Sequence, residues 1–179
     1  YWPLDELRAG ATPDVVGDYD LKATHLDVSD VVAGRHGRAI SFDSGRRTLL
    51  SRVHQVGEEL PINQHPSFTL SLWAKVDGRR QNDLRLFSEG NTVDSNPLFN
   101  LGTHSGGADG RLDVYLRQSG WPTFGHSYSE YEPLDGQWHH LAWVEQDGRR
   151  SLHVDGRLDA LEIAPRPDGT WRLDNTTLG

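Results

Sequence analysis

The stretch PLDGQWHHLAWVEQDGRRSLHVDGRLDAL, residues 133–161, decides the fold class. It contains three Asp-Gly pairs, and glycine adopts without steric cost the positive φ that tight hairpin turns require. Between these pairs polar and apolar residues alternate with period two, which is typical of half-buried β-strands. We therefore predict a β-meander. Its three expected strands are Trp138–Gln146, Arg150–Val154 and Arg157–Leu161.

The adjacent His139 and His140 raise the question of a metal site. Successive residues of a strand point to opposite faces of a sheet, so these two side chains cannot both ligate one ion from this strand. Alternation places His140 with Trp138, Ala142 and Val144, and places His139 with Leu141, Trp143 and Glu145. We expect His140 to pack structurally and His139 to be partly exposed.

The same alternation appears elsewhere in the chain. In residues 68–76 Phe, Leu, Leu, Ala and Val share one face, and Leu112, Val114 and Leu116 repeat the pattern. No long stretch has helical periodicity, and short strands separated by turn signals indicate an all-β fold. We predict one domain over residues 1–179, a two-sheet antiparallel jelly-roll sandwich.

Composition excludes several classes of function. The 179 residues carry a formal net charge of −8, a sign opposite to that of most nucleic-acid binders. The absence of cysteine excludes disulfides and Cys-ligated zinc. No apolar run reaches the roughly 18 residues that a membrane span needs. Because the chain begins at Tyr1 and has no methionine, we expect a segment of a longer polypeptide whose targeting signal lies elsewhere.

Several motifs together resemble the laminin G-like branch of the concanavalin A-like lectin/glucanase superfamily, bacterial jelly-roll type. The motifs are YWPLDE at 1–6, GRAISFD at 37–43, FTLSLW at 68–73, DGQWHHLA at 135–142 and LHVDG at 152–156. The resemblance covers nearly the whole chain, with residues 1–6 as the first strand. It implies a further strand after Leu178, and we expect that last strand to be missing from this sequence.

The superfamily contains sugar-binding modules, glycosidases, adhesion domains and spacers, so the fold alone leaves the function open. We expect a non-catalytic module that binds a glycan within a larger exported protein, with a periplasmic, cell-surface or secreted location. A structural or protein–protein interaction domain without a small ligand is the first alternative. An atypical glycoside hydrolase or lyase is the second.

The sequence argues against an enzyme. Glycosidases need two carboxylates at a defined separation, and the Glu-x-Asp-x-x-Glu pattern of the superfamily's glucanases is absent. Glu130 and Glu132 have the spacing of a pair, but they occur in a predicted aromatic loop and we expect them to be solvated. No nucleophile elbow, phosphate-binding loop or zinc-protease helix motif is present.

Aromatic residues are the candidate ligand-binding groups, because aromatic faces stack on sugars. We predict that Trp73, Tyr115 and Trp143 lie on faces away from the core, where they form a ligand platform or are covered by loops and long Arg and Lys stems. The segment 121–128 is a second candidate, through Trp121 and Tyr128. Its aromatic residues bind ligand or instead plug the edge of the core.

The resemblance also implies calcium at the rim of the sandwich, between two loops. The corresponding residues here are Asp94 and Asn96 in one loop and Gln118 in the other. Carboxylate and amide oxygens suit Ca²⁺, although glutamine in place of aspartate lowers the charge of the site. The alternative is an Asx-rich turn without an ion.

Overall fold

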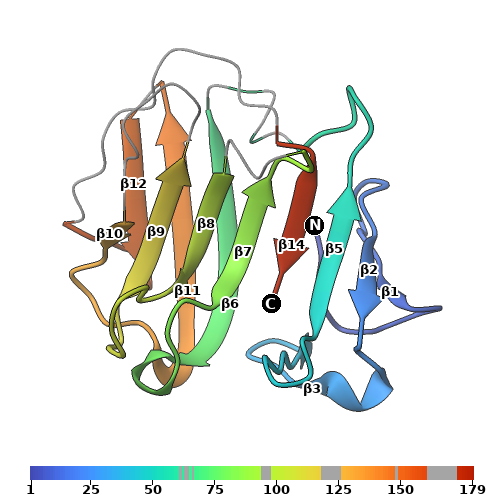
Figure 1. Cartoon of the computed structure of the whole chain (residues 1–179), viewed down its shortest axis with the longest axis horizontal. Coiled ribbons are helices and arrows are strands. Elements are labelled where there is room, and N and C mark those ends of the chain that lie inside the picture. Colours follow the sequence, from blue (N-terminus) through green and yellow to red (C-terminus); the bar gives the residue numbers. More distant parts are fainter. Residues whose placement is uncertain are drawn as a thin grey trace.

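The computed structural model of the chain consists of two antiparallel sheets packed face to face, with a separate hairpin (Figure 1). The structure describes residues 1–60, 62, 65, 67–93, 98–117, 126–147, 149–160 and 173–179. The two-sheet antiparallel sandwich predicted from the sequence is therefore confirmed. Among the residues described, no helix is long and apolar enough to cross a membrane.

The large sheet has eight strands, and its outer face is turned toward the viewer in Figure 1. In spatial order its strands are β1 (Ala11–Thr12), β2 (Leu21–Thr24), β5 (Leu49–Val53), β14 (Asn175–Leu178), β7 (Arg85–Gly90), β8 (Leu98–Thr103), β9 (Leu112–Arg117) and β10 (His126–Tyr128). The small sheet comprises β13 (Arg157–Leu158), β12 (Arg149–Val154), β11 (Asp135–Gln146) and β6 (Phe68–Asp77). The hairpin pairs β3 (Val31–Ala33) with β4 (Arg38–Ile40), and two 3₁₀ turns are η1 (Val28–Asp30) and η2 (Gly78–Arg80).

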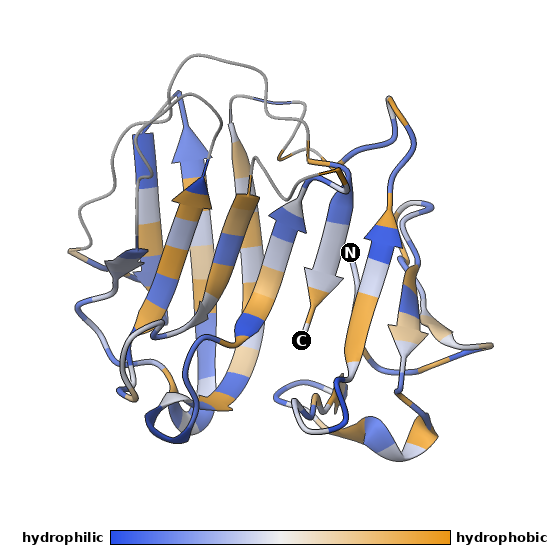
Figure 2. Cartoon of the chain, in the orientation of Figure 1, coloured by the Kyte–Doolittle hydropathy of each residue, from blue (hydrophilic) through white to orange (hydrophobic). Residues whose placement is uncertain are grey.

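Alternating hydropathy along the strands builds the main core, as the banding of Figure 2 shows. The inward residues of β7, β8 and β9 meet those of β11 and β12 in one cluster of buried side chains. Its members include Phe87, Phe99, Val114, Leu141 and Trp143. Each sheet covers the apolar face of the other, which is the arrangement that stabilises a sandwich.

A second cluster lies under the other half of the large sheet, on the side of β1, β2 and β5 in Figure 1. Leu21, Ile40 and Leu50 form its buried centre, and Trp2 packs against them. The Trp2 indole Nε1 donates to the Tyr19 carbonyl at 2.7 Å. The predicted first strand at residues 1–6 is wrong, because these residues cover the core edge without pairing in a ladder.

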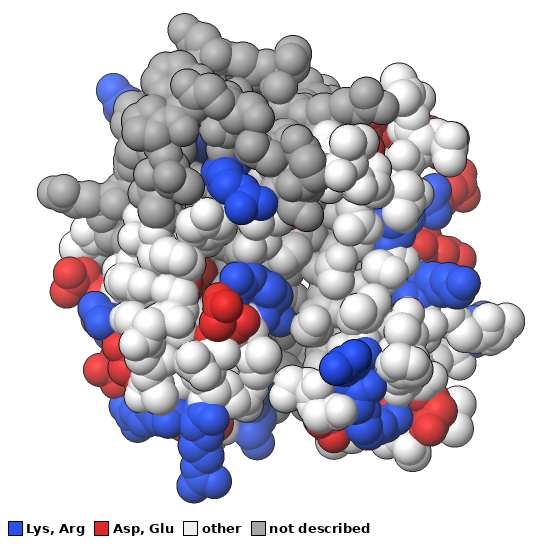
Figure 3. All heavy atoms as spheres, in the orientation of Figure 1, with Lys and Arg blue, Asp and Glu red and all other residues white. Residues whose placement is uncertain are grey.

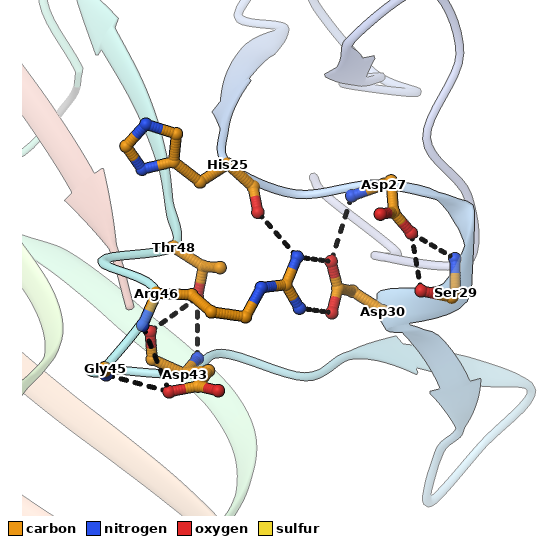
Figure 4. Close-up of polar contacts among 8 residues, drawn as sticks. All are labelled: His25, Asp27, Ser29, Asp30, Asp43, Gly45, Arg46 and Thr48. Carbon is orange, nitrogen blue, oxygen red and sulfur yellow. Dashed lines mark hydrogen bonds and ion pairs between the residues drawn. The ribbon is translucent and has the colours of Figure 1, made fainter.

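A polar cluster fixes the base of the β3–β4 hairpin (Figure 4). The Arg46 guanidinium donates to Asp30 Oδ1 at 2.6 Å and Oδ2 at 3.0 Å, and also to the His25 carbonyl at 2.8 Å. This side-chain hydrogen bond from Arg46 holds the pKa of Asp30 below its ordinary value. Asp27 caps η1 by accepting from the Ser29 N–H at 2.8 Å. The hairpin is thereby tied to the 43–48 turn.

The predicted meander is present with shifted boundaries. β11 begins at Asp135, three residues earlier than expected, and β12 begins at Arg149. The third predicted strand ends in a part of the chain outside the described residues. Asp155 and Gly156 have φ of 51° and 78°, as a tight hairpin turn requires. Asp77-Gly78 differs, because it leads into η2 instead of a two-residue hairpin.

Candidate functional site

Trp143 lies in the core, so its predicted place on a solvent face is wrong. Its side chain is only 1% exposed and packs edge-to-face on Phe99, with ring centroids 5.4 Å apart. The reason is the register of β6 with β11, which sets Trp143 opposite Leu70. Directly opposed residues of an antiparallel pair share a face, and the face of Leu70 is the core face.

Trp73 is 40% exposed on the outer face of the small sheet, as expected. Its ring is partly covered, since the Arg35 guanidinium lies 5.2 Å from its centroid and His36 packs edge-on at 5.4 Å. Both residues come from the turn of the β3–β4 hairpin. The predicted alternative to a ligand platform is a face covered by arginine stems, and Arg35 covers Trp73 in this way. Trp73 and Tyr115 also belong to different sheets, so they do not form one platform.

The structure instead aligns polar residues across the outer face of the large sheet. Cross-strand partners form one continuous series over seven neighbouring strands, which we call the polar row: Lys22, Ser51, Thr177, Ser88, Asn100, Tyr115 and His126. At about 4.8 Å between strands, the row spans about 29 Å. Uncharged atoms predominate over the described part of this face, and basic and acidic side chains lie both at its margins and near its middle (Figure 3). The row therefore offers mainly neutral hydrogen-bonding groups.

Asn100 anchors the middle of the polar row and is 4% exposed. With its amide turned to satisfy both neighbours, its nitrogen donates to Ser88 Oγ at 2.5 Å and its oxygen accepts from Arg85 Nε at 3.0 Å. These bonds hold Ser88 and Arg85 in fixed positions. A fixed set of donors and acceptors loses less entropy when a ligand binds.

Two predicted residues, Tyr115 and Tyr128, are brought together at the β9–β10 end of the row. The imidazole of His126 lies between them, with its ring centroid 4.5 Å from Tyr115 and 6.2 Å from Tyr128. Asp113, whose side chain is 3% exposed, accepts from His126 Nδ1 at 2.7 Å. This bond orients the imidazole, whose side chain is partly exposed.

Asp113 is the most buried charge at this end of the row. Burial raises the pKa of its carboxyl, and the hydrogen bond from His126 offsets the rise in part. Its second oxygen, Oδ1, has no hydrogen-bond partner in the part of the chain that the structure describes. A neighbouring layer extends the aromatic surface, since His104 stacks on Tyr128 at 3.8 Å and Ser105 Oγ lies 2.7 Å from the Tyr128 hydroxyl.

The structure leaves some predicted site residues unplaced. Trp121 and the expected calcium ligands Asp94, Asn96 and Gln118 lie outside the described residues. Within the described ranges, no group of three or more His, Asp or Glu side chains is arranged to hold a metal ion. The calcium site therefore stays a prediction.

A second depression, which we call the rim pocket, lies at the end of the small sheet. It has a volume of about 340 Å³ and is lined by Tyr131, Glu132, Pro133, His139, Val154, Asp155 and Arg157. His139 makes two carboxylate contacts there, through Nδ1 to Asp155 at 2.7 Å and through Nε2 to Asp135 at 3.1 Å. Partial burial acts to lower the pKa of His139, but these two bonds hold it above its ordinary value.

Sequence reasoning missed most of both sites. The alternation of β8 identifies Asn100 as an outward residue between Phe99 and Leu101, and this signal was available. The alignment of Asn100 with Ser88 and Tyr115 depends on strand register, which the hydropathy pattern of separate strands does not contain. The rim pocket combines residues 131–133 with the β12–β13 turn, and their proximity follows only from the folded chain.

Comparison with known families gives a match over most of the chain. Residues 53–177 match a laminin G family model that is described as the concanavalin A-like lectin/glucanases superfamily. Comparison with curated proteins gives no match. The matched residues run from the end of β5 to β14 and so include most of the polar row and the whole rim pocket. The chain therefore belongs to the concanavalin A-like lectin/glucanase superfamily.

Proposed function

We propose that this protein is a non-catalytic recognition module that binds a glycan chain along the polar row. The observation that carries the proposal is the alignment of hydroxyl, amide, phenol and imidazole groups across neighbouring strands. Sugars present many neutral hydroxyl groups and apolar C–H faces, and such groups pair with polar side chains and aromatic rings respectively. An extended row suits a ligand several sugar residues long.

The proposal favours binding over catalysis because of the charges on this face. A second row beside the first contains Arg85, Gly102, Asp113 and Tyr128. Of the residues in these two rows, Asp113 is the one carboxylate, and glycoside hydrolysis ordinarily uses two. Its bond to His126 gives it a positioning role for the imidazole. We include in this proposal an exported parent protein, because extended glycans are chiefly found outside the cell.

The alternative of a structural module without a ligand is favoured by one observation, the burial of Trp143 in the core. The polar row favours recognition. A binding experiment separates the two functions more directly than the burial of single residues does.

A glycan array screened with the purified chain tests the proposal. One series contains about 2 mM Ca²⁺ and the other contains a chelator instead. We expect specific binding that Tyr115→Ala abolishes and Trp73→Ala preserves, because Trp73 is on the opposite face of the sandwich. Loss of binding in chelator would add the predicted calcium. A blank array from folded protein, or binding that needs Trp73 and not Tyr115, would contradict the proposal.

A further inference from the structure

Hydrogen bonds within the protein hold the wall of the rim pocket in place without a ligand. Asp159, whose side chain is buried, accepts from the backbone N–H groups of Glu130 and Tyr131, each at 3.0 Å. Glu132 accepts from Arg79 Nη2 at 2.6 Å. These contacts fix the 130–132 segment, so the exposed Tyr131 ring borders a depression of defined shape.

The acidic groups of the rim pocket are already engaged. Asp155 accepts from His139 Nδ1 at 2.7 Å through one oxygen and from the His140 N–H at 2.9 Å through the other. Those two bonds hold the pKa of Asp155 below its ordinary value, with the backbone N–H the larger influence. Glu132 forms a solvent-exposed ion pair with Arg79.

Arg157 is the lining charge that remains available. Its guanidinium has no ion pair or hydrogen bond among the residues that the structure describes, and the side chain is exposed beside the β12–β13 turn. A guanidinium presents a planar fork of N–H donors that matches a carboxylate in two parallel bonds. Arg157 therefore supplies a feature that the mainly neutral polar row lacks.

We propose that the rim pocket binds a carboxylate-bearing sugar residue, with Arg157 contacting the carboxylate and the Tyr131 ring packing against the sugar ring. This inference rests on the proposed function in that the ligand is a glycan. The volume of about 340 Å³ is near the lower end of small-ligand pockets and suits a single ring rather than a chain.

Titration calorimetry and amide NMR test the proposal on the full chain. The probes are the methyl glycosides of glucuronic, galacturonic and mannuronic acid, each beside the methyl glycoside of its neutral hexose. We expect at least one uronide to bind about tenfold or more tightly than its neutral partner, equivalent to ~1.4 kcal/mol. Amide shifts should centre on Tyr131, Glu132 and residues 154–157.

Two variants identify the contact. Arg157→Gln should remove the preference for the uronide, and Tyr131→Ala should weaken both members of the pair. The matched control is Arg149→Gln, which removes the exposed arginine at the start of β12 and should leave binding unchanged. Because Arg157 is exposed, its variant should keep the NMR spectrum of folded protein.

The result that overturns the proposal is specific to the pocket. The proposal is wrong if no uronide binds better than its neutral hexose, or if the Arg157→Gln variant binds uronides as tightly as the wild type does. The Tyr115→Ala variant separates this proposal from the proposed function. It should abolish glycan binding to the polar row on the array and leave uronide binding in the rim pocket unchanged. Uronide binding lost in Tyr115→Ala and kept in Arg157→Gln would reject the pocket while supporting the polar row.

Discussion

Polar residues that are neighbours in sequence lie in opposite environments on the inner and outer faces of the large sheet. On β7, Ser88 points outward into the polar row, whereas Glu89 points inward and is fully buried. On β14, Thr177 points outward and Thr176 inward. The outer Ser88 and Thr177 are partly exposed, while the inner Glu89 and Thr176 must satisfy each other. Residue type alone does not reveal this difference, because both faces use polar side chains.

The inner polar residues form a connected chain that runs from His54, just after β5, through β14 to β7. His54 Nε2 lies 2.6 Å from Thr176 Oγ1, which in turn donates to Glu89 Oε1. Burial raises the pKa of Glu89 to about 8, and Glu89 Oε2 has no hydrogen-bond partner among the described residues. A buried acid without a cationic partner is most stable in its protonated form. The buried Glu89 therefore makes the stability of the fold depend on pH, whereas the outer polar groups contact solvent or ligand.

The largest expected effect comes from the inner face of the small sheet. Trp143→Ala should lower the free energy of unfolding by about 3–5 kcal/mol, because it leaves a large cavity beside Phe99. Urea unfolding followed by circular dichroism measures the change. Trp73→Ala, on the outer face of the adjacent strand, should cost about 1 kcal/mol or less. Equal costs for the two changes would contradict the inner and outer assignment.

The next effect is a pH dependence at Glu89. Its pKa is raised in the folded state, so its contribution to stability is full below the ordinary value of 4.5 and is lost as pH rises through about 8. Glu89→Gln removes this loss and should stabilise the fold at pH 8.5 by a few kcal/mol relative to wild type.

Urea unfolding of both proteins at pH 4.5 and at pH 8.5 measures that difference. At pH 4.5, where Glu89 is protonated in the fold, the two free energies of unfolding should be close. The matched control is Glu58→Gln, an exposed residue near the same end of the sheet, which should show little change between the two conditions. A Glu89→Gln advantage that does not grow with pH would show that Glu89 is not buried as a neutral acid.

An intermediate effect is expected for ligand affinity on the outer face. Asn100→Ala removes the amide that fixes Ser88 and Arg85, so glycan affinity should fall about tenfold, or ~1.4 kcal/mol. Calorimetry with a glycan selected on the array measures it. Val32→Ala, at an exposed position of the β3–β4 hairpin, is the control and should retain wild-type affinity. An unchanged affinity in Asn100→Ala would move the ligand away from the middle of the polar row.

The sequence was sufficient for the fold because alternation and turn chemistry are local. The core face of β6 and the inward residues of β9 follow from period two alone. For β11 the same rule is ambiguous, since Trp138 and Ala142 on one face are about as apolar as Leu141 and Trp143 on the other. Only the register that pairs Leu70 with Trp143 resolves it.

The candidate sites depend on contacts between distant segments, so less of them could be predicted. Tyr115 and Tyr128 were identified as aromatic candidates, but their meeting around His126 requires the pairing of β9 with β10. Arg157 gave no signal as one arginine among many. In the folded chain Glu132 pairs with Arg79 and Asp155 pairs with His139. Arg157 is therefore the charged group of the rim pocket that is available to a ligand.

The smallest expected effect concerns the covered outer face of the small sheet. The Arg35 guanidinium lies 5.2 Å from the centroid of Trp73, and an exposed cation–π contact contributes about 0.5–1 kcal/mol. A double-mutant cycle with Arg35→Ala and Trp73→Ala should give a coupling free energy in this range from urea unfolding. The same cycle with Arg79→Ala in place of Arg35→Ala is the control, because Arg79 pairs with Glu132 elsewhere. Zero coupling between Arg35 and Trp73 would show that the guanidinium does not stabilise this ring, and would leave His36 as its contact from the hairpin turn.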